Sequence, residues 1–152
     1  MTVQATIPSS LVIAEITDAD VAAVVALWQA CGLTRPWNDP AADIALARRG
    51  PSSAILVGRS PDSIVATAMV GHDGHRGWVY YVAVDPSSQG KGLGRTMMAA
   101  AEDWLRNAGV PKLQLLVRRE NAKAGAFYQS LGYEESTSVI LAKWLDGREA
   151  TS

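Results

Sequence analysis

The chain has 152 residues, of which 48% are hydrophobic and 19% charged, and its formal net charge at pH 7 is −1. This length and composition indicate a single globular domain and exclude a disordered chain. The near-neutral charge argues against general nucleic-acid binding, and no segment approaches the ~20 apolar residues of a membrane span. We predict one domain over residues 11–146, with flexible ends at 1–10 and 147–152, where chain ends usually lose order.

The sequence also predicts a cytoplasmic protein. Its one cysteine, Cys31, has no partner in the chain for a disulfide, which fits a reducing compartment. Residues 1–10 carry neither a basic leader nor a long apolar run, so we expect no secretory signal.

Hydrophobic patterns and turn residues predict strands and helices in a definite order along the chain. The predicted elements are a strand at 11–16, helices at 19–30 and 40–49, strands at 53–58, 64–71 and 78–84, a helix at 93–108, a strand at 112–118, a helix at 121–131 and a strand at 138–145.

Residues typical of helix ends mark these boundaries. The expected caps are Asp18, Asp39 (followed by Pro40) and Asn121, and the expected helix-ending glycines are Gly32, Gly109 and Gly132.

One strand and one helix are joined by a segment rich in glycine and cations, Gln89-Gly90-Lys91-Gly92-Leu93-Gly94-Arg95. Its glycines let the backbone approach a ligand closely. The first turn of the following helix leaves N–H groups unpaired, and the helix dipole favours an anion there. We therefore interpret this segment as a pyrophosphate site, and a plain tight turn is the alternative.

The spacing in this segment excludes two common nucleotide motifs. In a P-loop the lysine follows the last glycine and precedes a hydroxyl, whereas Lys91 lies between glycines. The dinucleotide motif G-x-G-x-x-G would need a glycine at Arg95. The pattern that fits is Q/R-x-x-G-x-G/A, through Gln89, Gly92 and Gly94. This is the acetyl-CoA motif of the GNAT (Gcn5-related) N-acetyltransferases, which the chain resembles here.

A second segment, residues 121–133, resembles the last helix of the same family. It contains an asparagine, then Ala124, then Phe127-Tyr128, and ends in Leu-Gly-Tyr. In GNAT proteins this asparagine contacts the pantetheine arm of CoA and the first tyrosine lies beside its sulfur. The resemblance implies these roles for Asn121 and Tyr128.

The order of the predicted elements is also similar to that of the GNAT fold. The resemblance implies an α/β (α+β) architecture, with a mixed central sheet of about six to seven strands flanked by about four helices. In that fold two splayed central strands hold acetyl-CoA. The implied CoA-binding residues are Val82, Ala83, Val84, Gln89, Gly90, Lys91, Gly92, Leu93, Gly94, Arg95, Asn121 and Tyr128.

The resemblance implies an enzyme that moves the acetyl group of acetyl-CoA to a primary amine by direct attack in a ternary complex. The acceptor would be a small molecule, an amino acid or a peptide, and no metal is expected. Two alternatives stay open: a protein N-terminus or lysine as acceptor, and a non-catalytic acyl-CoA-binding protein on the same fold. A monomer and a homodimer fit the sequence equally.

Two catalytic groups are expected. Tyr128 would be the general acid, because a phenol stays protonated at neutral pH and can donate to the departing thiolate. The backbone N–H near Val82 would face the thioester carbonyl as a small oxyanion hole. The alternative for Tyr128 is an aromatic side chain packed on an amphipathic helix.

The general base is less well marked. Many relatives carry a glutamate on the strand before the glycine-rich turn, and residues 78–84 contain no acidic residue. The chain has two histidines, His72 and His75, and we take His75 as the candidate base. The alternative is a polar hairpin turn with its tip at Asp73-Gly74. A metal site at the two histidines is not expected, because no further ligands lie nearby.

The acceptor is expected to contact the loop Arg35-Pro36-Trp37-Asn38-Asp39-Pro40, which borders the acceptor pocket in the GNAT fold. We expect Trp37, Asn38 and Asp39 of this loop, with Tyr80 of the neighbouring strand, to bind the acceptor. Alternatively, Trp37 packs as a structural residue and Asp39 only caps a helix. This loop and Gly71-His72-Asp73-Gly74-His75-Arg76-Gly77 resemble a bacterial subgroup of small GNAT proteins, the YpeA-like acetyltransferases.

Overall fold

The computed structural model describes residues 11–149. The flexible end predicted for 1–10 lies outside the described residues, as do residues 150–152 of the end predicted for 147–152. The chain divides into two compact units, one up to Leu116 and one from Val117 onward, and each is described by itself.

The first unit is built on one five-stranded sheet with the strand order β1-β2-β3-β4-β5. The strands are β1 (Val12–Glu15), β2 (Ser53–Arg59), β3 (Ile64–His72), β4 (Gly77–Val84) and β5 (Leu113–Leu115). Neighbouring strands run antiparallel except β4 and β5, which are parallel. The mixed sheet confirms the predicted fold class.

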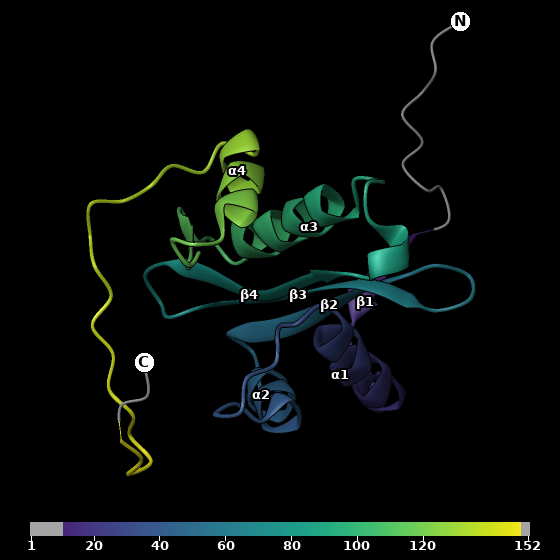
Figure 1. The fold of residues 1–152 in the computed structure, drawn as a ribbon, viewed down its shortest axis with the longest axis horizontal. Helices are drawn as coiled ribbons and strands as arrows, with labels where there is room; N and C mark the ends of the chain where they lie inside the picture. Colours follow the sequence, from purple (N-terminus) through teal and green to yellow (C-terminus); the bar gives the residue numbers. More distant parts are fainter. Residues whose placement is uncertain (1–10, 150–152) are drawn as a thin grey trace, which may run out of the picture. The chain divides into compact units, whose positions relative to one another are not determined.

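Three helices cover the two faces of this sheet. They are α1 (Val21–Ala30), α2 (Pro40–Ala47) and α3 (Leu93–Asn107). Figure 1 shows α1 and α2 on one face and α3 on the opposite face. A sheet with helices on both faces buries both sets of its side chains, which explains the nearly continuous apolar run of β3.

Each face of the sheet has its own packed core. The α1 and α2 face is filled by Ile16, Val24, Leu27, Trp28, Ile44, Ala47, Ile55, Val57 and Ala83. On α3 the buried residues are Leu93, Met97, Met98, Ala101 and Leu105. The helix lies close to the sheet at Gly77, where an added Cβ would stand 2.5 Å from Leu105 Cδ1. The glycine at the start of β4 therefore makes room for α3.

The predicted helix ends are confirmed at all three glycines. Gly32, Gly109 and Gly132 have φ angles of 68°, 79° and 95°, in the left-handed region that glycine adopts readily. The residue after each glycine donates back to the helix, Leu33 to Trp28, Val110 to Leu105 and Tyr133 to Tyr128. These are the bonds of the Schellman motif, which satisfies carbonyl groups at a helix end.

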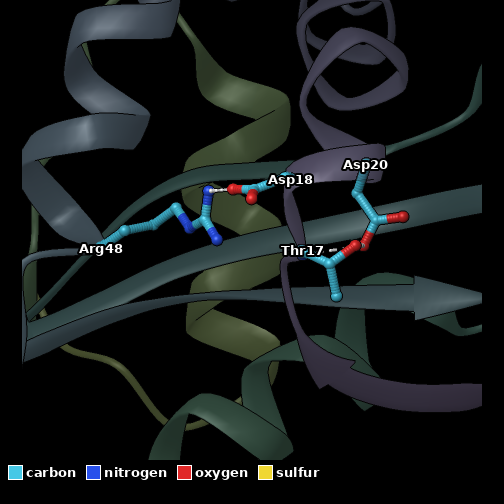
Figure 2. Close-up of polar contacts among 4 residues, drawn as sticks. All are labelled: Thr17, Asp18, Asp20 and Arg48. Atoms are coloured by element: carbon cyan, nitrogen blue, oxygen red, sulfur yellow. Dashed lines mark hydrogen bonds and ion pairs between the residues drawn. The ribbon is translucent and has the colours of Figure 1, made fainter.

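The cap predicted at Asp18 is wrong. A 3₁₀ helix at Asp18–Asp20 precedes α1, and Thr17 is the capping residue. The backbone N–H and the hydroxyl of Thr17 donate to Asp20 Oδ2 at 2.9 and 3.0 Å. Asp18 instead pairs with Arg48 at the end of α2, at 2.6 Å (Figure 2). Thr17 outcompetes Asp18 because only the residue three positions before Asp20 can bond with its carboxylate in this way.

The second unit contains α4 (Ala122–Ser130). Asn121 caps this helix as predicted, since its side chain accepts the N–H of Ala124 at 3.1 Å. Residues 138–145, predicted to be a strand, form none in the structure. Most of their apolar side chains are exposed, with Leu141 and Leu145 each 92% accessible, whereas Trp144 is half-buried.

The described residues thus form five strands rather than six to seven. The predicted strand at 112–118 is also shorter, at Leu113–Leu115. In both places the sequence has the apolar pattern of a strand but the backbone lacks a pairing partner, and a strand is stable only when it is paired. No helix among residues 11–149 is long and apolar enough to cross a membrane.

Candidate functional site

The glycine-rich turn leads into α3 through two left-handed glycines. Gly90 has a φ of 81°, and Gly92, the N-cap of α3, a φ of 77°. An added Cβ at either position would meet no atom within 4 Å. Glycine is favoured at both positions because of the positive φ angle, and not because a side chain would collide with a neighbour. The space beside both glycines is open for a ligand.

The start of α3 offers free backbone donors. No side chain caps this end. The Thr96 N–H is bonded to the Gly92 carbonyl at 3.1 Å, so the N–H groups of Leu93, Gly94 and Arg95 precede the first bond of the helix. Such N–H groups and the helix dipole together bind an anion.

Two exposed cations, Lys91 and Arg95, lie on the same turn. The turn is fixed to the end of β4, since Gln89 Nε2 donates to the Val84 carbonyl at 3.3 Å. The same carbonyl accepts Cys31 Sγ at 3.2 Å. A hydrogen bond thus links the predicted CoA-binding residues at 82–84 to those at 89–95, and the donors and charges of the turn fit a pyrophosphate.

Strand β4 separates from β5 just before this turn. The two strands pair only from Gly77 with Leu113 to Val79 with Leu115. Tyr80–Val84 continue beyond that point and pair only with β3. The backbone of β4 is consequently unpaired on the β5 side over its second half, as expected for splayed central strands.

A β-bulge lies in the unpaired half of β4. Met69 is paired with Tyr80 and Thr67 with Ala83, so Tyr81 and Val82 together oppose Ala68. Tyr81 has a φ of 51° and is the only residue other than glycine with a positive φ within 11–149. A left-handed aromatic residue is an outlier that marks a bulge or a functional site.

Tyr81 is held by residues from three other elements. Its ring stacks on Trp28 of α1, with centroids 3.7 Å apart and an interplanar angle of 7°. Its carbonyl accepts the hydroxyl of Thr67 at 2.9 Å, and Thr67 Oγ1 accepts Trp28 Nε1 at 2.9 Å. Its own hydroxyl donates to Asp43 Oδ2 of α2 at 2.7 Å. Burial and the neighbouring Asp43 carboxylate raise the pKa of Tyr81, which keeps the phenol protonated.

Sequence reasoning missed most of this network. It gave no role to Asp43 or Thr67. In the sequence Asp43 is an ordinary acidic residue in the first turn of a helix. The residue it contacts lies 38 positions away, and no local signal marks that contact.

The predicted acceptor residues lie in the loop before α2 and on β4. Asp39 caps α2 through a 3.1 Å bond from the Ala42 N–H, so its structural role is present. Trp37 and Asn38 are half-buried. Tyr80, next to the bulge, is 46% exposed, and burial of the rest of its side chain raises its pKa. Acceptor binding by these four residues stays a prediction.

His75 lies in the β3–β4 connection, which forms a polar turn. The carboxylate of Asp73 accepts the N–H groups of His75 and Arg76 at 2.9 and 2.7 Å. Bonds from Arg76, His75 and Trp78 lower the pKa of Asp73 to about 2. His75 is exposed and precedes β4, whereas the glycine-rich turn follows it. At ~3.3 Å per residue, the length of β4 separates them by roughly 23 Å.

The second unit places Asn121 at the start of α4 and Tyr128 within it. Tyr128 packs edge-on against Phe127 and Tyr133, with ring centroids 5.0 and 5.9 Å away. Burial raises the pKa of Tyr128. Both readings of this residue, a packed aromatic and a proton donor, are compatible with these surroundings.

No group of three or more potential metal ligands occurs among the described residues. Near the glycine-rich turn the first unit offers backbone N–H groups, two cations and an unpaired strand edge. Free N–H groups at a helix start are typical of anion sites, and an unpaired strand edge is suited to an extended ligand.

Comparison with known proteins gives a consistent result. A model described as the acetyltransferase (GNAT) family matches residues 16–133. An acetyltransferase of Yersinia enterocolitica is 37% identical over 127 residues, covering 84% of this chain and 90% of that protein.

Solved structures of acetyltransferases are also similar to this chain. The ribosomal-protein-S18-alanine N-acetyltransferase of Escherichia coli has a TM-score of 0.72 at 29% identity, covering 84% of this chain and 79% of that one. The aminoglycoside N-acetyltransferase AAC(6')-Iy in complex with CoA has a TM-score of 0.76 at 18% identity, covering 89% of this chain and 95% of that one. The second likeness concerns the fold alone.

Proposed function

The chain belongs to the GNAT family of acetyltransferases, and from this premise we propose that it transfers the acetyl group of acetyl-CoA to a primary amine. The acceptor is a small molecule, an amino acid or a peptide, and the amine attacks directly in a ternary complex. The observation that carries the proposal is the uncapped start of α3, with its two left-handed glycines, directly after the unpaired half of β4.

In this proposal, different residues of the first unit bind different parts of acetyl-CoA. The free N–H groups of Leu93 to Arg95, with the charge of Lys91, hold the pyrophosphate. The unpaired edge of Tyr81–Val84 bonds the extended pantetheine arm as a neighbouring strand would. Acetyl-CoA supplies an activated acetyl thioester, and the backbone N–H near Val82 stabilises charge on its carbonyl oxygen.

The second unit supplies the proton donor in this proposal. Tyr128 donates from its phenol to the departing thiolate, and its raised pKa keeps the proton available at neutral pH. Asn121 contacts the pantetheine arm with the part of its side chain that the helix cap leaves available.

The general base is the part of the mechanism that the structure supports least directly. A general base must lie within hydrogen-bond reach of the amine, directly or through one water. His75 lies at the end of β4 opposite the glycine-rich turn, so its role as a base stays a prediction. In this proposal the proton of the amine passes to water.

A protein N-terminus is a second candidate acceptor. It is favoured by the 29% identity to the Escherichia coli enzyme named for the alanine of ribosomal protein S18. A peptide with a free N-terminal alanine is therefore the most direct probe for this alternative.

The test combines calorimetry with acetyl-CoA and an assay for free thiol. The acceptor panel contains spermidine, neamine, amino-acid amides, a peptide with a free N-terminal alanine, and an N-acetylated peptide with one lysine. We expect acetyl-CoA binding, and thiol release with one class of acceptor. No binding at millimolar acetyl-CoA would reject the glycine-rich turn as the site, and binding without release across the panel would reject the proposed acceptors.

A further inference from the structure

The bulge of β4 needs support from outside its own strand. A residue with a Cβ is strained in the left-handed region, where Tyr81 has a φ of 51°. Neither β3 nor β4 has a glycine at the bulge to remove that cost, because Tyr81 and Val82 stand opposite Ala68. The conformation persists only if the surrounding contacts determine it.

Those contacts act on three separate parts of Tyr81. The ring is fixed in direction by Trp28, and the carbonyl is fixed by Thr67. The hydroxyl is fixed by Asp43, which is half-buried on α2. Of these three contacts, only the one to Asp43 ties the bulge to α2.

The bulge also decides the direction of the backbone that follows it. Ala83, which lies directly after it, is buried at 3% exposure. Removing the extra residue would shift the register of Val82–Val84 by one position, and a one-residue shift moves every side chain to the other face. The backbone groups that face the space beside β5 would then belong to the neighbouring residues instead.

We propose that Asp43 and Tyr81 are positioning residues for the acetyl-CoA site. Their hydrogen bond holds the bulge of β4 in the shape that presents the backbone of Tyr81–Val84 to the pantetheine arm and the thioester. This inference rests on the proposed function and adds to it two side chains, from α2 and β4, for which the sequence indicated no role.

The experiment compares variants of this bond with a matched control. Tyr81→Phe removes the hydroxyl and keeps the ring, and Asp43→Ala removes the acceptor. Asp43→Asn keeps an oxygen that accepts the hydroxyl of Tyr81. The control is Asp18→Ala, which removes a different carboxylate that also ties α2, through Arg48 (Figure 2).

Two ligands are titrated by calorimetry: acetyl-CoA, and 3′-phosphoadenosine 5′-diphosphate, which carries the pyrophosphate without the pantetheine arm. We expect Tyr81→Phe and Asp43→Ala to bind acetyl-CoA about tenfold more weakly, the effect of one lost hydrogen bond. Their affinity for the pyrophosphate fragment should stay within about twofold of wild type. Asp43→Asn and Asp18→Ala should bind both ligands as wild type does.

Each other outcome has a definite meaning. Unchanged acetyl-CoA affinity in Tyr81→Phe would overturn the inference. If the affinities for both ligands fell equally and the melting temperature fell as well, the bond would only stabilise the fold and would not position the site. A defect in Asp43→Asn as large as in Asp43→Ala would show that the charge of Asp43 acts, rather than its hydrogen bond. If the wild-type protein bound no acetyl-CoA, the proposed function itself would fail.

Discussion

Tyr80 and Tyr81 are adjacent in the chain but have different surroundings. Tyr80 is 46% exposed, whereas Tyr81 stacks on one side chain and donates to another. The strand alternates its side chains between the two faces of the sheet, and the bulge then adds a left-handed residue. Chemistry at the residue scale is therefore set by position in the sheet, since the residue type is the same.

Tyr128 gives the prediction at this scale. Tyr128→Phe should lower kcat by about 100-fold, the lower end of the range for a general acid, and change the Kd of acetyl-CoA by less than about threefold. Because burial raises the pKa of Tyr128 and the protonated form is the active one, the wild-type rate should not lose this acid below about pH 10. Steady-state kinetics over pH and calorimetry provide the measurements.

The control for Tyr128 is its neighbour in the same aromatic cluster. Tyr133→Phe removes a hydroxyl at a ring 5.9 Å from Tyr128, and it should keep the wild-type kcat. A Tyr128→Phe enzyme with unchanged kcat would leave water or another group as the acid.

At the scale of elements, a left-handed glycine lies at each end of α3, but the two ends differ in the backbone groups that they expose. Gly92 begins the helix and Gly109 follows its end, with φ angles of 77° and 79° and no atom within 4 Å of an added Cβ. Only the start presents free N–H groups, because the first turn of a helix has no preceding carbonyl groups to accept them, and the helix dipole adds positive charge there. The two glycines thus share one conformational requirement, and one of them has a ligand role in the proposal.

This pair allows a controlled test of the glycine-rich turn. Gly92→Glu and Gly109→Glu should each lower stability by about 1 kcal/mol, the cost of a left-handed residue with a Cβ. Gly92→Glu should also weaken acetyl-CoA binding at least about 100-fold, because a bulky anion would occupy the anion site. Gly109→Glu should leave that affinity unchanged. Melting curves and calorimetry measure both effects, and equal affinities in the two variants would remove the turn from the site.

At the scale of the whole molecule, acid stability depends on a carboxylate in the first unit. Asp20 is 5% exposed and bonds with Arg59 of β2 at 2.9 Å and with Thr17. Burial alone would raise its pKa, but the bonds from Arg59 and Thr17 outweigh burial, and the net pKa is lowered. A lowered native pKa adds stability that is present above the unfolded value near 4 and is lost as the pH falls below it.

We therefore expect Asp20→Asn to lose about 1–3 kcal/mol of stability at pH 7, the range for a hydrogen bond to a charged group. The difference from wild type should shrink as the pH falls below about 4. The exposed pair of Asp18 and Arg48 supplies the comparison, because Asp18→Asn should cost at most about 1 kcal/mol. Urea unfolding from pH 3 to pH 7 tests this, and a difference independent of pH would contradict the assignment.

The sequence by itself determined the features that neighbouring residues encode. The glycine-rich turn, the caps at Asp39 and Asn121, and the glycine ends of the helices follow from local backbone conformation and were predicted correctly. The order of strands and helices through α4 follows from hydrophobic periodicity.

Only the tertiary structure decided the features that depend on distant contacts. The bulge at Tyr81 depends on pairing with β3, and the bond of Tyr81 to Asp43 spans 38 positions. The separation of β4 from β5 depends on where the pairing of two distant strands ends. The predicted strand at 138–145 has the right pattern but no partner, so its pattern alone could not make it a strand. Local propensity depends on adjacent residues, whereas strand pairing and hydrogen bonds between distant side chains form only when the chain packs.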